Sequence, residues 1–461
     1  MVDMVRNNKL VELATAPVAR LLWRYSMPAV VGMVVNSLYN VIDRIFIGRG
    51  VGADAIAGLA ITFPVMNLSV AIGVLIGAGA SARVSILLGA NDHRNASMVL
   101  GNALVLMVVN ALVYLGIFAV FLDPILKAFG ASPTSLPYAK EFLTYLFPGM
   151  LVMNLSFGFN NIMRASGYPV RAMVTLFIGT LCNLCLAPLF IFVLGWGIKG
   201  AAIATDISMT ISACFVFSHF FRSDSTLHFQ RGIYRLKWPI VLGIISIGAA
   251  PSVVNAAGSI INVIVNTSLY RYGGDSAVAA AGIFTTVTSL LVMVVVGICQ
   301  GMQPIIGYNY GAGRLDRLRR VFWLAAGVST VICAAGFIVG MTVPELVAKA
   351  FTVDDDLIAV TANALRISLV MFWCVGFQVV ATTFFQSIGK AGQSIFLSLT
   401  RQVLFMIPFL LIFPGHMGLD GIWSAFPASD TCATIVTAAM VMYQMKRMAR
   451  MRPGVRHDSV D

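Results

Sequence analysis

Residues 28–48 form the run P-A-V-V-G-M-V-V-N-S-L-Y-N-V-I-D-R-I-F-I-G. This run is about as long as the ~20 residues that a helix needs to cross a membrane. Asn36, Asn40 and Asp43 interrupt it at spacings of four and three residues, which place their side chains on one face of a helix. Because a carboxylate at bilayer depth is costly, we expect this face to point toward protein or a water-filled cavity rather than lipid.

The rest of the chain also has the composition of a membrane protein. Hydrophobic residues make up 59% of the 461 residues, charged residues make up 11%, and the mean hydropathy is +0.88. Soluble domains have about 25% charged residues. We therefore expect an all-α polytopic membrane protein, embedded in the lipid bilayer. Its twelve apolar runs are residues 23–48, 55–82, 97–122, 137–163, 170–194, 199–221, 239–269, 276–305, 321–343, 357–386, 393–413 and 421–444.

The positive charges predict the topology of the chain. The net charge is +12, and most of the 31 Lys and Arg residues lie at those ends of the runs that share the side of the N-terminus. Cytoplasmic loops carry an excess of Lys and Arg, so both termini are expected in the cytoplasm and the protein in the cell inner membrane. Since the basic residues are not gathered on a soluble domain, we expect no nucleic-acid partner.

The chain resembles itself at an offset of 222 residues. The N-V-I at 40–42 aligns with the N-V-I at 262–264, and Gly79 aligns with Gly301. Six helices duplicated into twelve give two six-helix lobes in the same orientation, as in the parallel repeats of transporters. The predicted domains are an N-terminal lobe at 1–221, a cytoplasmic linker at 222–237, and a C-terminal lobe at 238–461 that ends in a basic cytoplasmic tail.

No motif in the sequence indicates an enzyme. The chain has no G-x-x-x-x-G-K-[ST] loop to hold a nucleotide, no H-E-x-x-H pair and no soluble stretch long enough for a catalytic domain. We therefore expect no enzymatic activity, no catalytic residues and no cofactor. Two lobes that enclose a cavity suit a transporter that works by alternating access, although the symmetry alone also permits a channel.

Polar residues inside the apolar runs are the candidate functional site. Asp43 is the leading acidic residue because Asn36 and Asn40 share its face, and together with Asn183 it forms the predicted ion-coupling site. At the offset of 222 the counterpart of Asp43 is Val265, so coupling is expected mainly in the N-terminal lobe. The predicted substrate cavity has the further polar residues Asn154, Asn161, Asn255, Asn262, Gln300, Gln303 and Asp430.

Several motifs carry a family resemblance. The stretch Q-P-I-I-G-Y-N-Y-G-A-G at 303–313 closely resembles the eighth-helix signature of the multidrug and toxic compound extrusion (MATE) family. G-A-S-A-R-V-S-I-L-L-G-A at 79–90 resembles the family's second-helix signature, and R-A-S-G at 164–167 is similar to its R-A-x-G loop. The similarity covers essentially the whole chain, and F-Q-S-I-G-K at 385–390 indicates the branch with DinF-like and MepA-like exporters.

This resemblance implies a MATE-type fold and secondary active multidrug export. The implied substrates are small amphipathic organic compounds, often cationic, which are exchanged for H⁺ or Na⁺ without ATP. The family's first-helix aspartate matches Asp43 and its fifth-helix asparagine matches Asn183, so Asp43 is the candidate Na⁺ ligand, whereas Ala187 replaces a frequent second acid. We expect a monomer. The alternatives are a lipid-linked oligosaccharide or lipid flippase of the same superfamily, or a channel.

Overall fold

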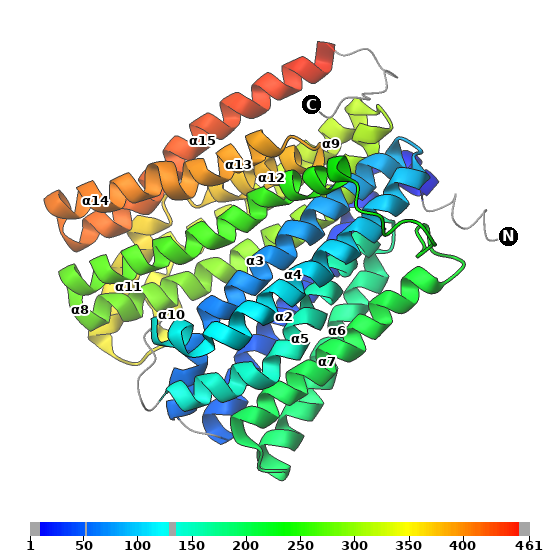
Figure 1. Ribbon diagram of the computed structural model, residues 1–461. Coiled ribbons are helices and arrows are strands. Elements are labelled where there is room, and N and C mark those ends of the chain that lie inside the picture. The colour runs from blue at the N-terminus through cyan, green and yellow to red at the C-terminus, as the bar shows by residue number, and fades with distance from the viewer. Residues whose placement is uncertain (1–9, 51–52, 129–134, 451–461) are drawn as a thin grey trace. The chain divides into compact units, whose positions relative to one another are not determined.

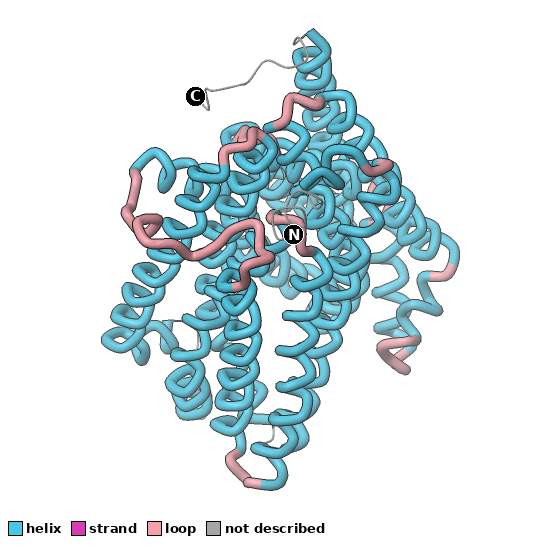
Figure 2. The backbone as a smooth tube through the Cα atoms, turned by 90° about the vertical axis from the view of Figure 1, so that its right-hand side faces the viewer, coloured by secondary structure: helices cyan, strands magenta, loops and turns pink. Residues whose placement is uncertain are grey.

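The computed structural model describes residues 10–50, 53–128 and 135–450, and all regular structure within these ranges is helical (Figures 1 and 2). Two of the elements, η1 and η2, are short π-helical segments, which often occur near functional sites. In chain order the elements are α2 (Val18–Gly50), α3 (Ala53–Gly89), α4 (His93–Ala128), α5 (Leu136–Ala165), α6 (Pro169–Pro188), η1 (Leu189–Val193), α7 (Gly197–Phe221), α8 (Trp238–Gly311), α9 (Leu315–Thr342), α10 (Pro344–Lys349), α11 (Asp355–Ser368), α12 (Trp373–Ser387), α13 (Ala391–Leu399), η2 (Thr400–Phe405), α14 (Met406–Met417) and α15 (Leu419–Arg450).

Within the described ranges, ten helices are long and apolar enough to cross a membrane. The pair α11 and α12, bent by 57°, adds an eleventh span when it is counted as one. The helix α8 enters this count once, but it consists of two helices that meet at Gly274, where φ is 64° and ψ is −158°. A positive φ is readily adopted by glycine, which has no Cβ. With α8 divided at Gly274, the described helices account for the twelve predicted runs, and the predicted all-α membrane fold is confirmed.

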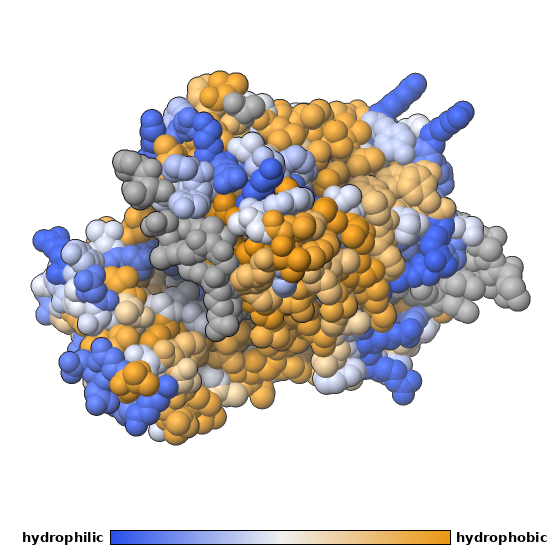
Figure 3. Space-filling model, turned by 90° about the horizontal axis from the view of Figure 1, so that it is seen from below, coloured by the Kyte–Doolittle hydropathy of each residue, from blue (hydrophilic) through white to orange (hydrophobic). Residues whose placement is uncertain are grey.

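The surface of the protein is suited to lipid. Large hydrophobic side chains are exposed along most helices, including Phe221 of α7 and Leu411 of α14. Figure 3 shows a face on which hydrophobic residues form a broad area, while hydrophilic residues gather toward its ends. Soluble monomers rarely expose apolar patches of more than a few hundred Å². The chain is therefore a multi-pass membrane protein.

The chain folds as two compact units whose boundaries lie inside helices. Unit 1 contains residues 31–252 together with the segment that precedes α2, and unit 2 contains residues 17–30 and the chain from Val253 onward. The first part of α2 thus belongs to the unit built mainly from the second half of the chain, and the first part of α8 belongs to the other. The domains predicted at 1–221 and 238–461 follow the sequence repeat. Each compact unit instead includes the first helix segment of the other half of the chain, so the predicted domain boundaries stay a prediction.

Each exchanged segment is held in its unit by a close helix crossing at a glycine. In unit 1, a Cβ on Gly79 of α3 would lie 1.9 Å from the carbonyl oxygen of Ile244, in the first part of α8. In unit 2, a Cβ on Gly301 of α8 would lie 2.5 Å from the Cα of Ser26, in the first part of α2. Gly79 and Gly301 are equivalent at the offset of 222. The two halves therefore use the same glycine for the same contact, as small residues do between membrane helices.

Helix α5 is central to unit 1, where it packs against α3 and α7 (Figure 1). Phe147 of α5 meets Tyr114 of α4 edge to face, with ring centroids 6.5 Å apart. The Tyr114 hydroxyl donates a 2.6 Å hydrogen bond to the carbonyl oxygen of Val65 on α3. A Cβ on Gly77 of α3 would lie only 2.7 Å from the Cα of Gly158, so these two backbones are in close contact. Apolar and hydrogen-bonded contacts thus fix α3, α4 and α5 to one another.

Unit 2 has its own apolar core. Helix α9 packs against α12, and α14 packs against α15. The fully buried Trp423 of α15 shares a core cluster with Val265 of α8. The Ser368 hydroxyl of α11 donates a 3.2 Å hydrogen bond to the Trp423 carbonyl. Since Val265 is the repeat counterpart of Asp43, the second half has an apolar contact where the first half has a carboxylate.

The loop between α7 and α8, residues 222–237, is attached to unit 1 by Asn102 of α4. The Asn102 Nδ2 donates to the carbonyl oxygens of Ile233 and Arg235, at 3.3 and 3.1 Å. Its Oδ1 accepts a 2.9 Å bond from the Lys237 backbone N–H. One buried amide side chain therefore satisfies three backbone groups where the chain enters α8.

Candidate functional site

Helix α2 carries Asp43 along the side of α6. A Cβ on Gly32 would lie 2.7 Å from Leu176 Cδ1, and the ring of Phe46 meets that of Phe192 edge to face at 6.2 Å. These two contacts show that α2 and the α6–η1 segment run in the same direction. Asp43 lies between the two contact points, is half-buried, and has its Oδ1 buried. One oxygen of its carboxylate is thus shielded from the surface of unit 1.

Asn183 lies on the part of α6 that these contacts hold alongside α2. Its side chain is 2% exposed, and its Nδ2 donates a 3.0 Å hydrogen bond to the Thr205 hydroxyl of α7. The same hydroxyl donates a 3.0 Å bond to the Ala201 carbonyl. The bond orients the Asn183 amide, because the nitrogen is directed at Thr205 and the carbonyl oxygen is left as an acceptor. Thr205 is not among the residues predicted from the sequence, although its position next to Asp206 in an apolar run was a usable signal.

Ala187 follows Asn183 by one helical turn and adds no charge to this region. It is fully buried in an apolar cluster that also contains Ile47, which follows Asp43 by one turn. Asp43 is the single acidic residue in the sequences of α2 and α6. The two helices α2 and α6 therefore contribute one carboxylate, that of Asp43.

The structure describes the side chain of only one of the two asparagines on the Asp43 face of α2. Asn36 is half-buried on α2, two turns before Asp43. The side chain of Asn40 lies outside the described part of the structure. The coupling roles predicted for Asp43, Asn36, Asn40 and Asn183 stay predictions.

The two amides predicted on α5 both face α3. Asn154 is buried and its Nδ2 donates a 2.7 Å hydrogen bond to the Ser69 hydroxyl. Asn161 is half-buried, with its Nδ2 3.6 Å from the place of a Cβ on Gly77. Both side chains lie at the junction of α3 and α5, and the structure brings neither into a described contact with Asp43. Their role in a substrate cavity stays a prediction.

The four amides predicted on α8 do not form one buried group. Asn255 and Asn262 are exposed, whereas Gln300 and Gln303 are half-buried. The Nε2 atom of Gln303 is buried. These four amides therefore occupy both exposed and partly buried positions, and their role in a substrate cavity stays a prediction.

Asp430 of α15 forms an ion pair with Arg401, which is carried by η2. The Arg401 Nε lies 2.7 Å from the Asp430 Oδ1, and Asp430 is 4% exposed. The Ser429 hydroxyl donates a 2.7 Å bond to the Arg401 carbonyl, and the Gln378 Nε2 donates a 2.8 Å bond to the Asp430 carbonyl. The charge of Asp430 is thus balanced inside the protein. The place of Asp430 in the substrate cavity stays a prediction. The structure pairs its carboxylate with Arg401.

Arg401 lies within the span Ala391–Met417, in a π-helical segment. Its position inside the apolar run 393–413 was the signal that it requires a partner, because an arginine in a membrane helix usually pairs with another group.

Asp206 lies against the backbone of Gly149. A Cβ on Gly149 would lie 1.8 Å from the Asp206 Oδ1, an atom that is buried. This contact joins α7 to α5, so only glycine at position 149 leaves room for the carboxylate.

The residue types beside α2 and α6 fit a hard cation. In the described ranges no group of three or more His, Cys, Asp and Glu side chains is placed to hold a metal ion. Hard cations take oxygen ligands from carboxylates, amides and hydroxyls. Asp43, Asn183 and Thr205 supply these three types, so the donor set is compatible with Na⁺ as well as with a proton on Asp43.

Comparison with known proteins agrees with this architecture. The chain is 24% identical over 445 residues to the multidrug export protein MepA of Staphylococcus aureus strain MSSA476, covering 96% of this chain and 97% of MepA. MepA of Staphylococcus haemolyticus strain JCSC1435 is also 24% identical, over 446 residues. A solved structure described as the outward-facing conformation of a multidrug resistance MATE family transporter matches with a TM-score of 0.90 and 25% identity, over 96% of this chain and 99% of that chain.

A second solved structure is a MOP superfamily transporter from Pyrococcus furiosus Vc1, described as having a binding pocket of reverse polarity. It matches with a TM-score of 0.89 and 25% identity, over 96% of this chain and 99% of that chain. The MatE family model matches this chain twice, over residues 28–189 and 251–412, which confirms the internal duplication. The two matches together cover more than half of the chain, and the chain belongs to the MatE family.

Proposed function

We propose that the protein is a secondary active exporter of the inner membrane, which exchanges small amphipathic, often cationic organic compounds for H⁺ or Na⁺. Family membership supports transport, and relatives named multidrug export proteins match nearly the whole chain. The observation that carries the proposal is the oriented Asn183–Thr205 pair on the part of α6 that lies alongside the Asp43 segment of α2. These three side chains belong to one compact unit.

The exchange follows from charge balance at a single carboxylate. A bound proton or Na⁺ neutralises Asp43, and a cationic substrate in the same unit offers an alternative counter-charge. Because α2 and α6 contain no second acidic residue, and the Asp206 carboxylate of α7 lies against Gly149 of α5, binding of both cations beside Asp43 leaves one positive charge uncompensated in a medium of low dielectric, which is unfavourable. Loading the ion therefore favours release of the substrate, which is the coupling that an antiporter needs.

The proposed alternating access depends on α2 and α8, each of which begins in one compact unit and continues in the other. The unit boundary lies between Val30 and Val31 in α2 and between Ser252 and Val253 in α8. Pro28 and Pro251 lie within three residues of these boundaries. Proline removes one intrahelical hydrogen bond and thereby weakens the helix locally. We place the bending of α2 and α8 at these two prolines.

The buried pair in unit 2 supports coupling in unit 1. Asp430 is already neutralised by Arg401 at 2.7 Å. A carboxylate that is held by a permanent cation does not need a transported ion for charge balance. Asp43 is therefore the proposed coupling group, and Asp430 is a structural acid.

The proposal is tested with purified protein in liposomes loaded with a fluorescent cationic dye. A pH gradient and a Na⁺ gradient are imposed separately, and dye movement is followed with and without a reagent that collapses each gradient. We expect dye accumulation against its concentration gradient under at least one ion gradient, with loss of accumulation when that gradient is collapsed. Dye that only equilibrates, with the same rate under all conditions, would indicate a channel and overturn the proposal.

A further inference from the structure

The contact between α6 and α7 in the first half of the chain has an equivalent in the second half, where the α13–η2 segment contacts α15. The two contacts can be aligned by a polar bond that both halves share. The bond between Ser156 of α5 and Ser212 of α7 recurs 222 residues later, where Gln378 of α12 bonds to Thr434 of α15. The side chains at the two contacts can therefore be compared position by position.

The first half closes its contact with a glycine. A Cβ on Gly179 of α6 would lie 3.4 Å from the Oγ of Ser212 and 3.9 Å from the carbonyl oxygen of Ser208, both on α7. At the offset of 222, Gly179 corresponds to Arg401. Ser208 corresponds in the same way to Asp430. The second half therefore has an ion pair at the place where the first half has small residues in contact.

Packing alone does not account for this ion pair. Small residues bring membrane helices into close contact, as Gly179 does in the first half. Compared with uncharged residues that fill the same space, a buried ion pair adds little stability, because both charges lose their hydration. The presence of Arg401 at this contact thus indicates a role other than packing.

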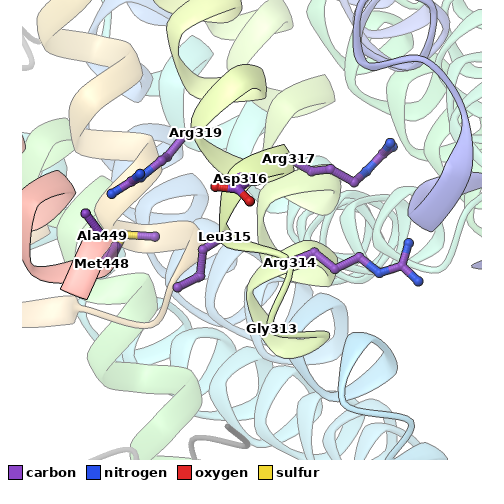
Figure 4. A pocket seen from close by; sticks show the side chains of 8 residues that line it. All are labelled: Gly313, Arg314, Leu315, Asp316, Arg317, Arg319, Met448 and Ala449. Carbon is purple, nitrogen blue, oxygen red and sulfur yellow. The ribbon is translucent and has the colours of Figure 1, made fainter. Parts of the chain in front are cut away.

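Arg401 lies deeper in its span than the arginines at the start of α9. Arg314, Arg317 and Arg319 line a pocket there, and Arg319 extends away from the other two (Figure 4). Long basic side chains at a helix end reach the water beside the membrane. Arg401 lies near the middle of the span Ala391–Met417, where an arginine almost always points into the helix bundle or a water-filled cavity.

The guanidinium of Arg401 uses one of its nitrogens and leaves the other two open. Its Nε donates a 2.7 Å hydrogen bond to the Asp430 Oδ1. Neither Nη1 nor Nη2 forms a hydrogen bond within the described residues, and 32% of the side chain is exposed. Both charges of the pair act on the buried Cys333 thiol of α9, so the guanidinium lies among helices. Because lipid tails offer no hydrogen-bond acceptor, the two Nη groups are expected to face water inside the helix bundle.

We propose that Arg401 binds an uncharged acceptor oxygen of the substrate, such as the carbonyl of an ester, an amide or a ketone. Asp430 already balances the charge of Arg401, so an uncharged acceptor satisfies the open N–H groups and adds no net charge at membrane depth. Arg401 belongs to η2, and π-helical segments often occur at functional sites. This inference rests on the proposed function, because it names a chemical group by which the exporter selects its amphipathic substrates.

The test uses two cationic dyes that differ in one group. Tetramethylrhodamine methyl ester carries an ester carbonyl, and tetramethylrosamine has the same cationic ring system without the ester. Binding of each dye to the purified protein in neutral detergent is measured by fluorescence polarisation. The measured quantity is the dissociation constant of the rosamine divided by that of the ester. A variant that weakens dye binding in general leaves this ratio unchanged.

The key variant is Arg401→Met/Asp430→Asn, which removes the guanidinium together with its counter-charge and so keeps the interior neutral. The matched control is Arg366→Met/Glu345→Gln, which removes an exposed ion pair of the same unit. A second variant, Arg401→Lys, keeps the positive charge beside Asp430 but lacks the planar group with two further nitrogens. Melting temperatures show which variants are folded.

We expect the wild type and the control to have the same ratio. The ratio should be about tenfold lower in both Arg401 variants, the loss expected from one charged hydrogen bond. A wild-type ratio in a folded Arg401 variant would overturn this inference and leave the proposed function intact. Failure of the wild type to bind either dye would overturn the inference together with the proposed function.

Discussion

The two halves of the chain share one backbone plan but place their charges differently. Both halves hold an exchanged helix segment at an equivalent glycine, Gly79 or Gly301. In the first half Asp43 lies on α2 without another acidic residue on α2 or α6, whereas its counterpart Val265 lies in an apolar core. The second half buries its acid, Asp430, against Arg401. The two halves thus share the contacts that shape the helices but differ in the placement of their charges, which is why we propose ion coupling in the first half alone.

The largest expected effect comes from breaking the charge pair of the second half. Arg401→Met leaves the Asp430 carboxylate buried without its cation, which should cost about 3–5 kcal/mol of stability. The double variant Arg401→Met/Asp430→Asn removes both charges and should recover most of the loss. Thermal melting in detergent measures both. If the double variant is as unstable as the single one, charge balance is not the role of the pair.

A smaller effect is expected at the equivalent glycine crossings. Gly301→Ala would place a Cβ 2.5 Å from the Ser26 backbone, and Gly79→Ala would place one 1.9 Å from the Ile244 carbonyl. Each helix pair must move apart, at a cost of about 1–3 kcal/mol typical of overpacking. Gly327→Ala is the control, because no atom lies within 4 Å of its Cβ position. Melting temperatures equal to that of the control would show that the crossings are loose.

Substitutions of two asparagines, one in each half, test whether ion coupling is confined to the first half. Asn183→Ala removes the amide that is bonded to Thr205, whereas Asn262→Ala alters an exposed side chain in the other half. Gradient-driven dye transport should fall about tenfold for Asn183→Ala, equivalent to about 1.4 kcal/mol. Transport by Asn262→Ala should stay near the wild-type rate. Equal losses in both variants, at equal expression, would argue against a site confined to the first half.

The smallest effect concerns a surface ion pair present only in the first half. Asp224 lies 3.0 Å from Arg171 and 3.1 Å from Arg222, and the repeat counterpart of Arg171 is Gln393. Burial alone raises the pKa of Asp224, but hydrogen bonds and attraction from Arg171 and Arg222 lower it to about 2. Because the folded pKa lies below the unfolded value of about 3.9, the pair stabilises the fold above that pH and loses its effect as the pH falls toward 2.

Asp224→Asn should therefore lower stability by less than about 1 kcal/mol, as for other partly exposed pairs. The difference from the wild type should be constant between about pH 5 and 8, where the carboxylate is ionised in both states. Melting curves over this range provide the measurement. A difference that grows or shrinks across it would mean that another titrating group governs the loop.

The sequence was sufficient for the helices and the duplication because these depend on long, regular patterns. Each apolar run is as long as a spanning helix, and the repeat at 222 residues holds through both halves. The Arg401–Asp430 pair was not predicted, because it joins residues 29 positions apart through a π-helical turn. Thr205 lies next to Asp206 in the sequence, but its bond to Asn183 joins two helices and appears only in three dimensions.

The exchange of helix segments between units also escaped sequence analysis. The apolar run at 23–48 predicts a membrane helix, but not which helix its first residues pack on. That choice depends on close contacts such as the one between Ser26 and Gly301, which appear only in three dimensions. The sequence thus predicts helices and repeats well, and partners poorly.

The central claim is that Asp43 exchanges the coupling ion for substrate, and Asp43→Asn tests it most directly. Asparagine keeps the size and most hydrogen bonding of aspartate but does not ionise. Purified wild type and variant are placed in liposomes, and the ion flux that follows substrate addition is recorded together with substrate binding. We predict that the variant binds substrate and shows no substrate-linked flux of H⁺ or Na⁺. A variant with wild-type flux at equal reconstitution would contradict the account, and Asp43 would then be a structural residue.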